Sequence, residues 1–291
     1  MSSISDIKSR INNIEQTRKI TKAMYLISSI KLNRVKKQVK ETKYFFDKIN
    51  ETLYDITMKS QYINSMYIDK NSKITDGKKA YLVFIGDNGL AGNYNYNTIK
   101  AVEKYVTDRE NSVLMVVGYM GKNTIKNMKY NIDEGFNYFV HNPTLLRAKE
   151  MTDKLIQMYV AAKVDEIYII YNDMISSFKH ETKLVKILPI NIDVLKQNVS
   201  TRNEKYNIEQ IKYEPSVHQV FDSLIPLYLK GSIYGLLVDA YACEQSSRIF
   251  AMDSATKNAT KIIRKLRGSY NKERQYRITK ELNELISGMD I

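Results

Sequence analysis

The chain has 291 residues, of which 43% are hydrophobic and 26% charged, and this composition is typical of a folded globular protein. No apolar run approaches the roughly 20 residues that cross a bilayer, and the charged first residues do not resemble a secretory signal. The single cysteine, Cys243, excludes an internal disulfide framework. The three histidines lie far apart in the sequence, so we expect no metal site and a protein of the cytosolic side.

The net charge of +13 points to an acidic partner. Residues 1–58 carry 12 Lys/Arg against 6 Asp/Glu, whereas residues 214–291 carry 11 against 9. Such an excess fits nucleic acid, an anionic membrane surface or a large acidic protein. The charge is dispersed rather than gathered in a basic tail, so the need to keep a long surface soluble explains it equally well.

The first 58 residues contain neither glycine nor proline and predict one long helix. A 3,4 spacing from Ile4 reaches 16 positions, of which 12 are apolar, as in the seam of a coiled coil. Ser3 and Asp6 fit a cap at its start. A helix of about 53 residues would be roughly 80 Å long, so it requires a second long helix to pack against.

Three residues, Arg18, Thr21 and Ser28, interrupt this seam. One interpretation is a tolerated interruption of a kind common in coiled coils. The other is a polar break that leaves charged groups free to contact another subunit.

The second long helix is expected at the other end of the chain, from about Glu214 to Ser287. Pro226 costs about 3 kcal/mol inside a helix, so it predicts a bend or two separate pieces. The middle of this segment is rich in small side chains, which we expect to form the seam against the N-terminal helix in an antiparallel shaft. These residues are Ala240, Ala242, Cys243, Ser246, Ser247, Ala251, Ser254, Ala255 and Ala259.

Strand-like and helix-like segments alternate between the two ends, which predicts a parallel sheet covered by helices. The last two strands lack a helix between them and should form an antiparallel hairpin. Strands are expected at 80–85, 113–117, 136–140, 166–171 and 184–190, and helices at 93–107, 120–129 and 144–162. The fold class is therefore α/β, with a Rossmann-like domain (77–205) inserted between an N-terminal (1–58) and a C-terminal (207–289) coiled-coil helix.

The segment "GDNGLAGNYN" follows the first strand and resembles a nucleotide-binding loop. Its glycines, Gly86, Gly89 and Gly92, match neither the GxGxxG spacing of dinucleotide folds nor the GxxxxGK[ST] spacing of phosphate loops. No lysine follows to reach a phosphate. A tight strand-to-helix turn that needs positive φ is the stronger interpretation.

Four segments together resemble the γ subunit of F-type ATP synthase, in order and over essentially the whole chain. They are "IKSRINNIEQTRKITKAM", "GDNGLAGNYN", "EQSSRIFAMDSATKNATKII" and "YNKERQYRITKELNELISG". The resemblance implies a non-catalytic rotor without cofactor or metal. Its terminal helices form a left-handed antiparallel coiled coil inside a ring of three α and three β subunits. Its central Rossmann-like domain lies outside that ring and binds no nucleotide.

The resemblance also implies contacts for individual residues. Lys22 and Met24, in "ITKAM", fall where the family's shaft meets an acidic loop of β, and Lys19, Lys31 and Arg34 suit the same acidic partner. Arg248, Gln275 and Thr279 match family positions that contact β. Tyr213 and Glu214, in "KYEPS", fall near the contact with the c-ring and ε. For each residue a solvated helix position is the alternative.

The remaining implications concern partners and place. A single copy would serve each complex at the cytoplasmic face of the bacterial plasma membrane, with membrane association only through the c-ring and no nucleic acid bound. Ala91 stands where the family often has a cysteine. The central domain has no cysteine-bearing insertion, so we do not expect thiol regulation. Two other hypotheses stay open: a Rossmann-type nucleotide-binding enzyme with a coiled-coil dimerisation arm, and a basic coiled-coil protein that binds nucleic acid or membrane.

Overall fold

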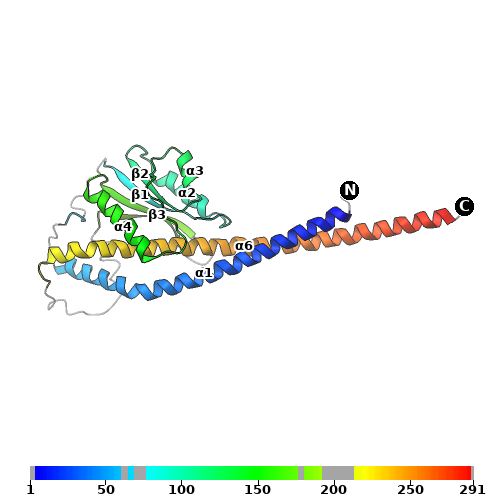
Figure 1. The fold of residues 1–291 in the computed structure, drawn as a ribbon, viewed down its shortest axis with the longest axis horizontal. Helices are drawn as coiled ribbons and strands as arrows, with labels where there is room; N and C mark the ends of the chain where they lie inside the picture. Colours follow the sequence, from blue (N-terminus) through cyan, green and yellow to red (C-terminus); the bar gives the residue numbers. More distant parts are fainter. Residues whose placement is uncertain (1–3, 60–64, 69–76, 176–179, 192–212, 290–291) are drawn as a thin grey trace. The chain divides into compact units, whose positions relative to one another are not determined.

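A computed structural model describes residues 4–59, 65–68, 77–175, 180–191 and 213–289. The chain forms two compact units, which we call the helical unit (residues 1–30 and 248–291) and the α/β unit (residues 31–247). Two long helices, α1 (Ile4–Lys59) and α6 (Val217–Met289), contribute to both units (Figure 1). The prediction of a long helix at each end is confirmed. No helix in the described residues is long and apolar enough to cross a membrane.

The α/β unit is built on a four-stranded sheet of order β2-β1-β3-β4. β1 (Lys79–Phe84) pairs in parallel with β2 (Ser112–Val117) and with β3 (Glu166–Met174). β4 (His180–Leu188) pairs antiparallel with β3, with a register shift between Ile167 and Tyr168. The mixed sheet with an antiparallel edge is therefore confirmed.

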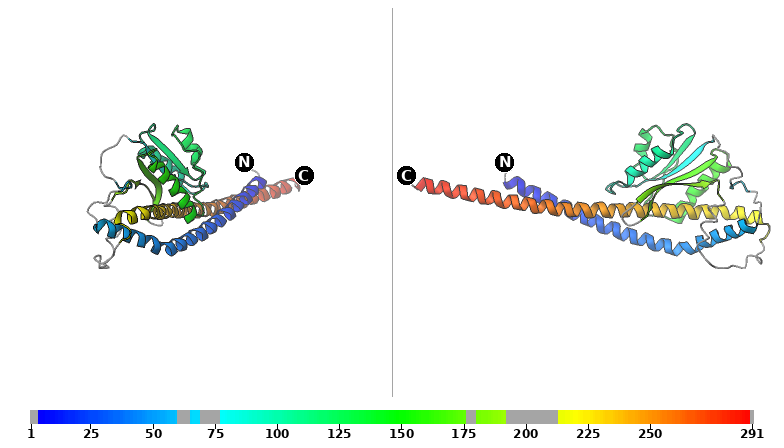
Figure 2. Two further views of the ribbon diagram at one scale, coloured as in Figure 1. Left: turned by 60° about the vertical axis from the view of Figure 1, so that its left-hand side comes forward. Right: turned by 180° about the vertical axis from the view of Figure 1, so that it is seen from behind.

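Helices cover both faces of this sheet (Figure 2). Alternate side chains along β1 point to opposite faces, as strand geometry requires. Leu82 and Phe84 share a core with α4 (Leu145–Val160), α1 and α6, whereas Val83 and Tyr81 share a second core with α2 (Tyr94–Tyr105) and α3 (Lys122–Asn127). Both cores exclude water, and their apolar burial is the main stabilising contribution.

The expected strand at 136–140 is wrong. This segment makes one isolated bridge, between Val117 and Tyr138, and Gly118 N donates to Tyr138 O at 2.9 Å. Phe136 and Val140 are buried in the α4 core, so the apolar run serves packing rather than strand pairing. The sequence period alone does not separate a buried loop of this kind from a short strand.

The predicted bend or break at Pro226 is also wrong, because α6 is continuous through it. Proline removes one backbone donor, which leaves the carbonyl four residues earlier, at Asp222, without its helical partner. Asp222 is exposed, so water can replace that hydrogen bond. The flanking residues Phe221, Ile225 and Leu229 are buried in the core, and their packing offsets the cost of the proline.

Within the α/β unit, α1 and α6 approach closely at one glycine. A Cβ atom placed on Gly231 would lie 2.2 Å from Cδ1 of Phe46. Phe46 also packs beside Tyr234, with ring centroids 6.3 Å apart. The missing side chain at residue 231 therefore makes room for an aromatic ring of α1.

We predict that Gly231→Ala destabilises the protein by about 1 to 3 kcal/mol, because the added methyl overlaps the Phe46 ring. The matched control is Gly235→Ala, one helical turn later, where a Cβ would meet nothing within 4 Å. That change should be neutral or stabilise by up to about 1 kcal/mol. Urea unfolding of both variants measures the difference, and equal stabilities would contradict the close approach.

Candidate functional site

The first candidate site is the crevice at the carboxyl ends of β1 and β3. The chain leaves β1 through α2 on one face of the sheet and returns from β2 to β3 through α4 on the other face. In doubly wound sheets, nucleotides bind at such a switch point. The glycine-containing loop, residues 86–92, begins at this place.

Side chains of α6 and α2 occupy this crevice. Tyr94, Ala91 and Cys243 form a small buried apolar cluster, and the Tyr94 hydroxyl donates to the Ala240 carbonyl at 3.1 Å. Cys243 was expected to face the N-terminal helix, and the structure corrects this, because its side chain packs with Ala91 and Tyr94. The small side chain of Cys243 makes room for Tyr94 and Ala91.

The same crevice is electrostatically unsuited to a phosphate. A Cβ on Gly86 would lie 3.2 Å from the carboxyl carbon of Glu244, a residue that is 1% exposed. Gly86 N, a donor that a phosphate would need, instead donates to Asn95 Oδ1 at 2.9 Å. A carboxylate at this position repels an anionic ligand, so the geometry argues against the nucleotide-binding alternative.

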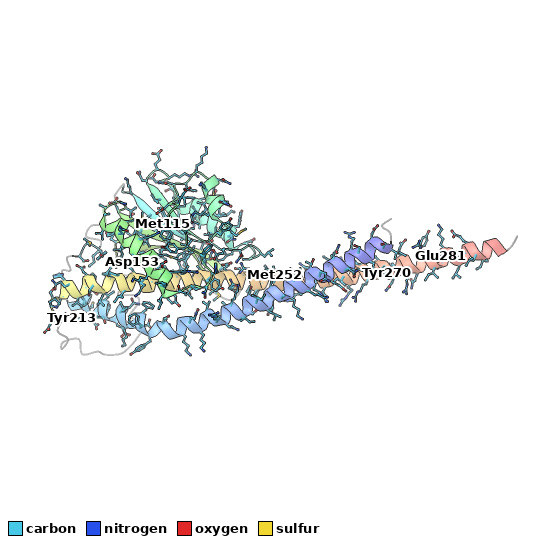
Figure 3. All side chains as sticks on the ribbon, viewed as in Figure 1. Met115, Asp153, Tyr213, Met252, Tyr270 and Glu281 are labelled. Carbon is cyan, nitrogen blue, oxygen red and sulfur yellow. The ribbon has the colours of Figure 1, made fainter. Side chains whose placement is uncertain are left out.

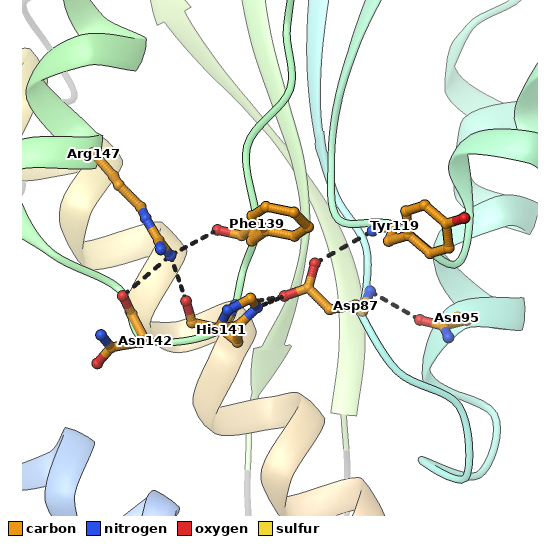
Figure 4. Close-up of polar contacts among 8 residues, drawn as sticks. Asp87, Asn95, Tyr119, Phe139, His141, Asn142 and Arg147 are labelled. Carbon is orange, nitrogen blue, oxygen red and sulfur yellow. Dashed lines mark hydrogen bonds and ion pairs between the residues drawn. The ribbon is translucent and has the colours of Figure 1, made fainter.

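Asp87 connects the loop after β1 with the loop after β2 and with the segment that precedes α4 (Figure 4). Its Oδ1 accepts from Tyr119 N at 3.3 Å, and its Oδ2 accepts from His141 N at 2.6 Å. The His141 ring nitrogen Nδ1 lies 2.8 Å from the same Oδ2. Arg147 extends the network by donating to the His141 carbonyl at 2.5 Å. Asp87 therefore fastens the loop after β1 to the loop after β2 and to the approach to α4.

A buried polar network lies behind the crevice. Asn172 Nδ2 donates to Thr98 Oγ1 at 2.7 Å, and Thr182 Oγ1 donates to Asn172 Oδ1 at 2.5 Å. Thr98 in turn donates to the Tyr94 carbonyl at 3.1 Å. These bonds tie α2 to β3 and β4 and satisfy polar groups that would be costly to bury alone. These contacts make the crevice a structural joint between α2 and the sheet.

The second candidate site is the surface of the helical unit. Its helices run antiparallel, because Glu15 pairs with Arg267 at 2.7 Å while Thr21 bonds Thr256 at 2.8 Å, oxygen to oxygen. Thr21 and Ser28 are buried. The predicted polar break thus lies inside the seam, and these two residues are not free to contact a partner.

Apolar side chains lie on the outside of the helical unit instead. A folded chain ordinarily buries such residues, and a contiguous exposed set marks an interaction surface. Figure 3 shows side chains standing out along α6 between Tyr270 and Glu281. The exposed apolar residues are Ile20, Leu26, Ile27, Ile30, Ile262, Tyr276, Ile278, Leu282, Leu285 and Ile286.

The residues that the sequence singled out occupy different environments. Lys22, Gln275 and Thr279 are exposed and Met24 is half-buried; Thr279 Oγ1 donates to the Gln275 carbonyl at 2.9 Å. Arg248 is only 6% exposed, which leaves little of its side chain for a partner. In the α/β unit, Glu214 is exposed, and burial together with the charge of Asp55 raises the pKa of the half-buried Tyr213.

Comparison with known proteins identifies the family. The family model described as ATP synthase matches residues 3–290. The ATP synthase gamma chain of Ruminiclostridium cellulolyticum is 43% identical over 97% of this chain and 96% of its own length. The chain belongs to the ATP synthase gamma chain family. The gamma chain of Acetivibrio thermocellus is 38% identical over 100% of this chain and 99% of its own.

Solved structures of the same kind share the fold. A chain from the Euglena gracilis mitochondrial ATP synthase, in a structure of OSCP, F1 and c-ring, has a TM-score of 0.67 at 14% identity and covers 99% of this chain and 93% of that chain. A chain from the Tetrahymena thermophila central stalk and c-ring has a TM-score of 0.55 at 23% identity and covers 81% and 99%. The long terminal helices around a mixed sheet are thus shared well beyond close relatives.

Sequence reasoning missed the exposed apolar residues of the helical unit. A signal for them was present, since Ile20, Leu26, Ile27 and Ile30 lie off the 3,4 seam that begins at Ile4. Apolar residues on more than one helix face indicate a helix that is covered on more than one side.

We predict that Asp87→Asn costs about 1 to 3 kcal/mol of unfolding free energy, because an amide cannot accept all of the N–H groups that converge on the carboxylate. The control is Glu134→Gln, which removes a charge from the exposed pair of Glu134 and Lys126 at 2.6 Å. That pair should be worth less than about 1 kcal/mol. Urea unfolding compares the two, and a loss no larger than that of the control would contradict the role of Asp87.

Tyr94 should make the stability sensitive to alkaline pH. Burial, and secondarily the charge of Glu244, raise the pKa of the Tyr94 hydroxyl well above 10.0. The unfolded chain therefore ionises at a lower pH than the folded chain, and stability should be fully present below pH 10 and fall above it. Tyr94→Phe should cost about 1 kcal/mol at neutral pH and lose less stability between pH 9 and 11, as measured by thermal unfolding. Equal slopes in both proteins would count against this assignment.

Proposed function

We propose that this chain is the central rotor shaft of an F-type ATP synthase. It transmits rotation of a membrane-embedded c-ring to catalytic subunits that make ATP, and it works in reverse during ATP hydrolysis. The observation that supports this most directly is the helical unit, an antiparallel helix pair that exposes apolar side chains along both helices. Such a surface requires a sheath of other subunits, and family membership names the kind of assembly.

The mechanism needs a stiff rod whose faces differ. Burial of Thr21, Ser28 and Met252 in the seam, together with the Glu15–Arg267 pair, holds the two helices together. The outer surface carries exposed apolar residues together with exposed charged ones, so its sides differ in chemistry. A shaft that contacts each surrounding subunit differently can bias their conformations in turn, whereas a symmetric rod would favour none of them. The chain itself contributes no catalytic group.

We assign the contacts to partner subunits from the exposure of each side chain. Lys22, Gln275 and Thr279 are available to a β subunit, with Met24 contributing an apolar edge. Arg248 is assigned to β by family position, and its burial suggests that it acts by fixing the local shape of α6. Tyr213 and Glu214 lie before the start of α6 and are the proposed contacts to the c-ring and ε.

The proposed assembly holds one copy of this chain with three α and three β subunits, ε and the c-ring. It would lie at the cytoplasmic face of the bacterial plasma membrane, attached through the c-ring alone. The absence of any helix able to cross a membrane in the described residues is compatible with that peripheral place. Neither nucleic acid nor a cofactor has a role in this proposal.

Co-expression with α and β subunits tests the function. We expect a complex with three α and three β per chain, and we expect Leu282→Ser with Leu285→Ser to lower its ATP turnover several-fold, because polar groups then face an apolar sheath. Gln275→Ala should weaken turnover as well. The control is Asn123→Ala, an exposed polar residue of α3, which should match the unchanged chain.

The same preparation separates this proposal from its alternative. Failure to associate with α and β, together with saturable binding of ATP or NAD to the isolated chain, would support a nucleotide-binding enzyme instead. Titration calorimetry on the full chain supplies that measurement.

A further inference from the structure

The last part of α6 is a helix with little to pack against. We define the α6 tip as residues 269–289, the part of the helix that follows Gly268. Residues 274–286 are all exposed, and large apolar side chains are among them. These are Tyr276, Ile278, Leu282, Leu285 and Ile286, whose exposed fractions range from 48% to 67%. Packing supplies most of the stability of helices in proteins, so the tip lacks the usual source of it.

The partner helix ends before the tip does. Glu15 of α1 pairs with Arg267 of α6 at 2.7 Å, and α1 begins at Ile4. Because the two helices run antiparallel with the same rise per residue, the start of α1 lies opposite about residue 278. Figure 1 shows α6 extending past the N-terminus. Within the described residues, no helix lies beside 279–289, and an isolated helix shorter than about 12 to 15 residues is marginal in water.

Gly268 weakens the helix at the start of the tip. In a helix interior, glycine shifts the equilibrium between helix and unfolded chain by about fivefold toward the unfolded chain, relative to alanine. A close neighbour can require such a residue, as Phe46 does at Gly231. No neighbour requires Gly268, since a Cβ there would meet nothing within 4 Å. This glycine therefore lowers the stability of the helix without a gain in packing within the described chain.

Ion pairs within the tip compensate only slightly. Arg277 Nε lies 3.5 Å from Glu281 Oε1, and Lys280 Nζ lies 3.6 Å from Glu284 Oε1. These four side chains are 63% to 67% exposed, and a basic residue before an acidic one is the less favourable order at this spacing. The last turn contains no basic residue to offset the negative end of the helix dipole. The tip is therefore close to the limit at which a helix forms.

We propose that the α6 tip opens readily in the free chain and becomes a stable helix only when α and β subunits cover its apolar side chains. Those side chains then gain, in the complex, the packing that the chain alone does not give them. Ordering of the tip on assembly lowers the net binding free energy, as for other segments that fold on binding. The identity of the covering subunits rests on the proposed function, whereas the weakness of the free tip follows from its own residues.

Hydrogen–deuterium exchange on the full chain, free and assembled with α and β, tests the proposal. In the free chain we expect the amides of residues 272–286 to exchange within about tenfold of the rate of an unfolded chain. The amides of residues 236–243, which belong to the part of α6 in the α/β unit, should be protected more than about a thousandfold. Assembly should raise the protection of the tip by more than about tenfold. Equal protection of the two segments in the free chain, or no rise on assembly, would overturn the proposal.

Two glycine variants of the free chain give a matched comparison. Gly268→Ala should slow amide exchange at residues 269–272 by about fivefold, because the helical hydrogen bonds of these amides span position 268. The control is Gly235→Ala, at a second position in α6 where a Cβ would meet nothing within 4 Å. It lies in the α/β unit and should leave exchange at residues 269–272 unchanged. An equal effect of the two variants at these residues would overturn the proposal.

The outcomes separate this proposal from the proposed function. If the chain assembles with α and β but its tip is already fully protected when free, the function stands and the ordering of the tip is wrong. If the unchanged chain fails to assemble with α and β, the proposed function fails, and this inference falls with it because those subunits are the proposed cover.

Discussion

The structure depends on one helix, α6, that serves two different cores. From Phe221 to Cys243 it supplies buried side chains to the α/β unit, and from Met252 to Ile263 it supplies the seam of the helical unit. Its small residue Cys243 packs with Tyr94 and Ala91, and the Ala240 carbonyl accepts a hydrogen bond from the Tyr94 hydroxyl, at the switch point of the sheet. A larger side chain at position 243 would push α6 away from Tyr94 and Ala91. The mixed sheet thus packs against a continuous helix.

The packing of α6 against the sheet also argues against nucleotide binding at the switch point of the Rossmann-like domain. The donor at Gly86 is used by Asn95, the converging N–H groups near β2 and α4 are used by Asp87, and Glu244 places a carboxylate beside the glycine. The N–H groups of Gly86, Tyr119 and His141 therefore already have partners within the chain. These polar groups bind other parts of the chain, and together with the packing of α6 they attach the domain rigidly to that helix.

The residues that we expect to serve the function consequently lie on the surface of the chain. The helical unit exposes apolar residues on both of its helices, as expected of a surface that other subunits cover. The net charge of +13 is likewise compatible with a chain whose neighbours in an assembly are acidic.

The sequence by itself determined the long terminal helices, the order of strands and helices, and the family. Hydrophobic periodicity and the absence of glycine and proline fix local structure, because they act over neighbouring residues. Only the tertiary structure decided which faces were covered. The 136–140 segment packs into the core and does not form a strand. The helix continues through Pro226 because the residues around it are buried in the core. Thr21 and Ser28 lie inside the seam. Burial depends on what a distant segment places opposite a side chain, and no local pattern contains that information.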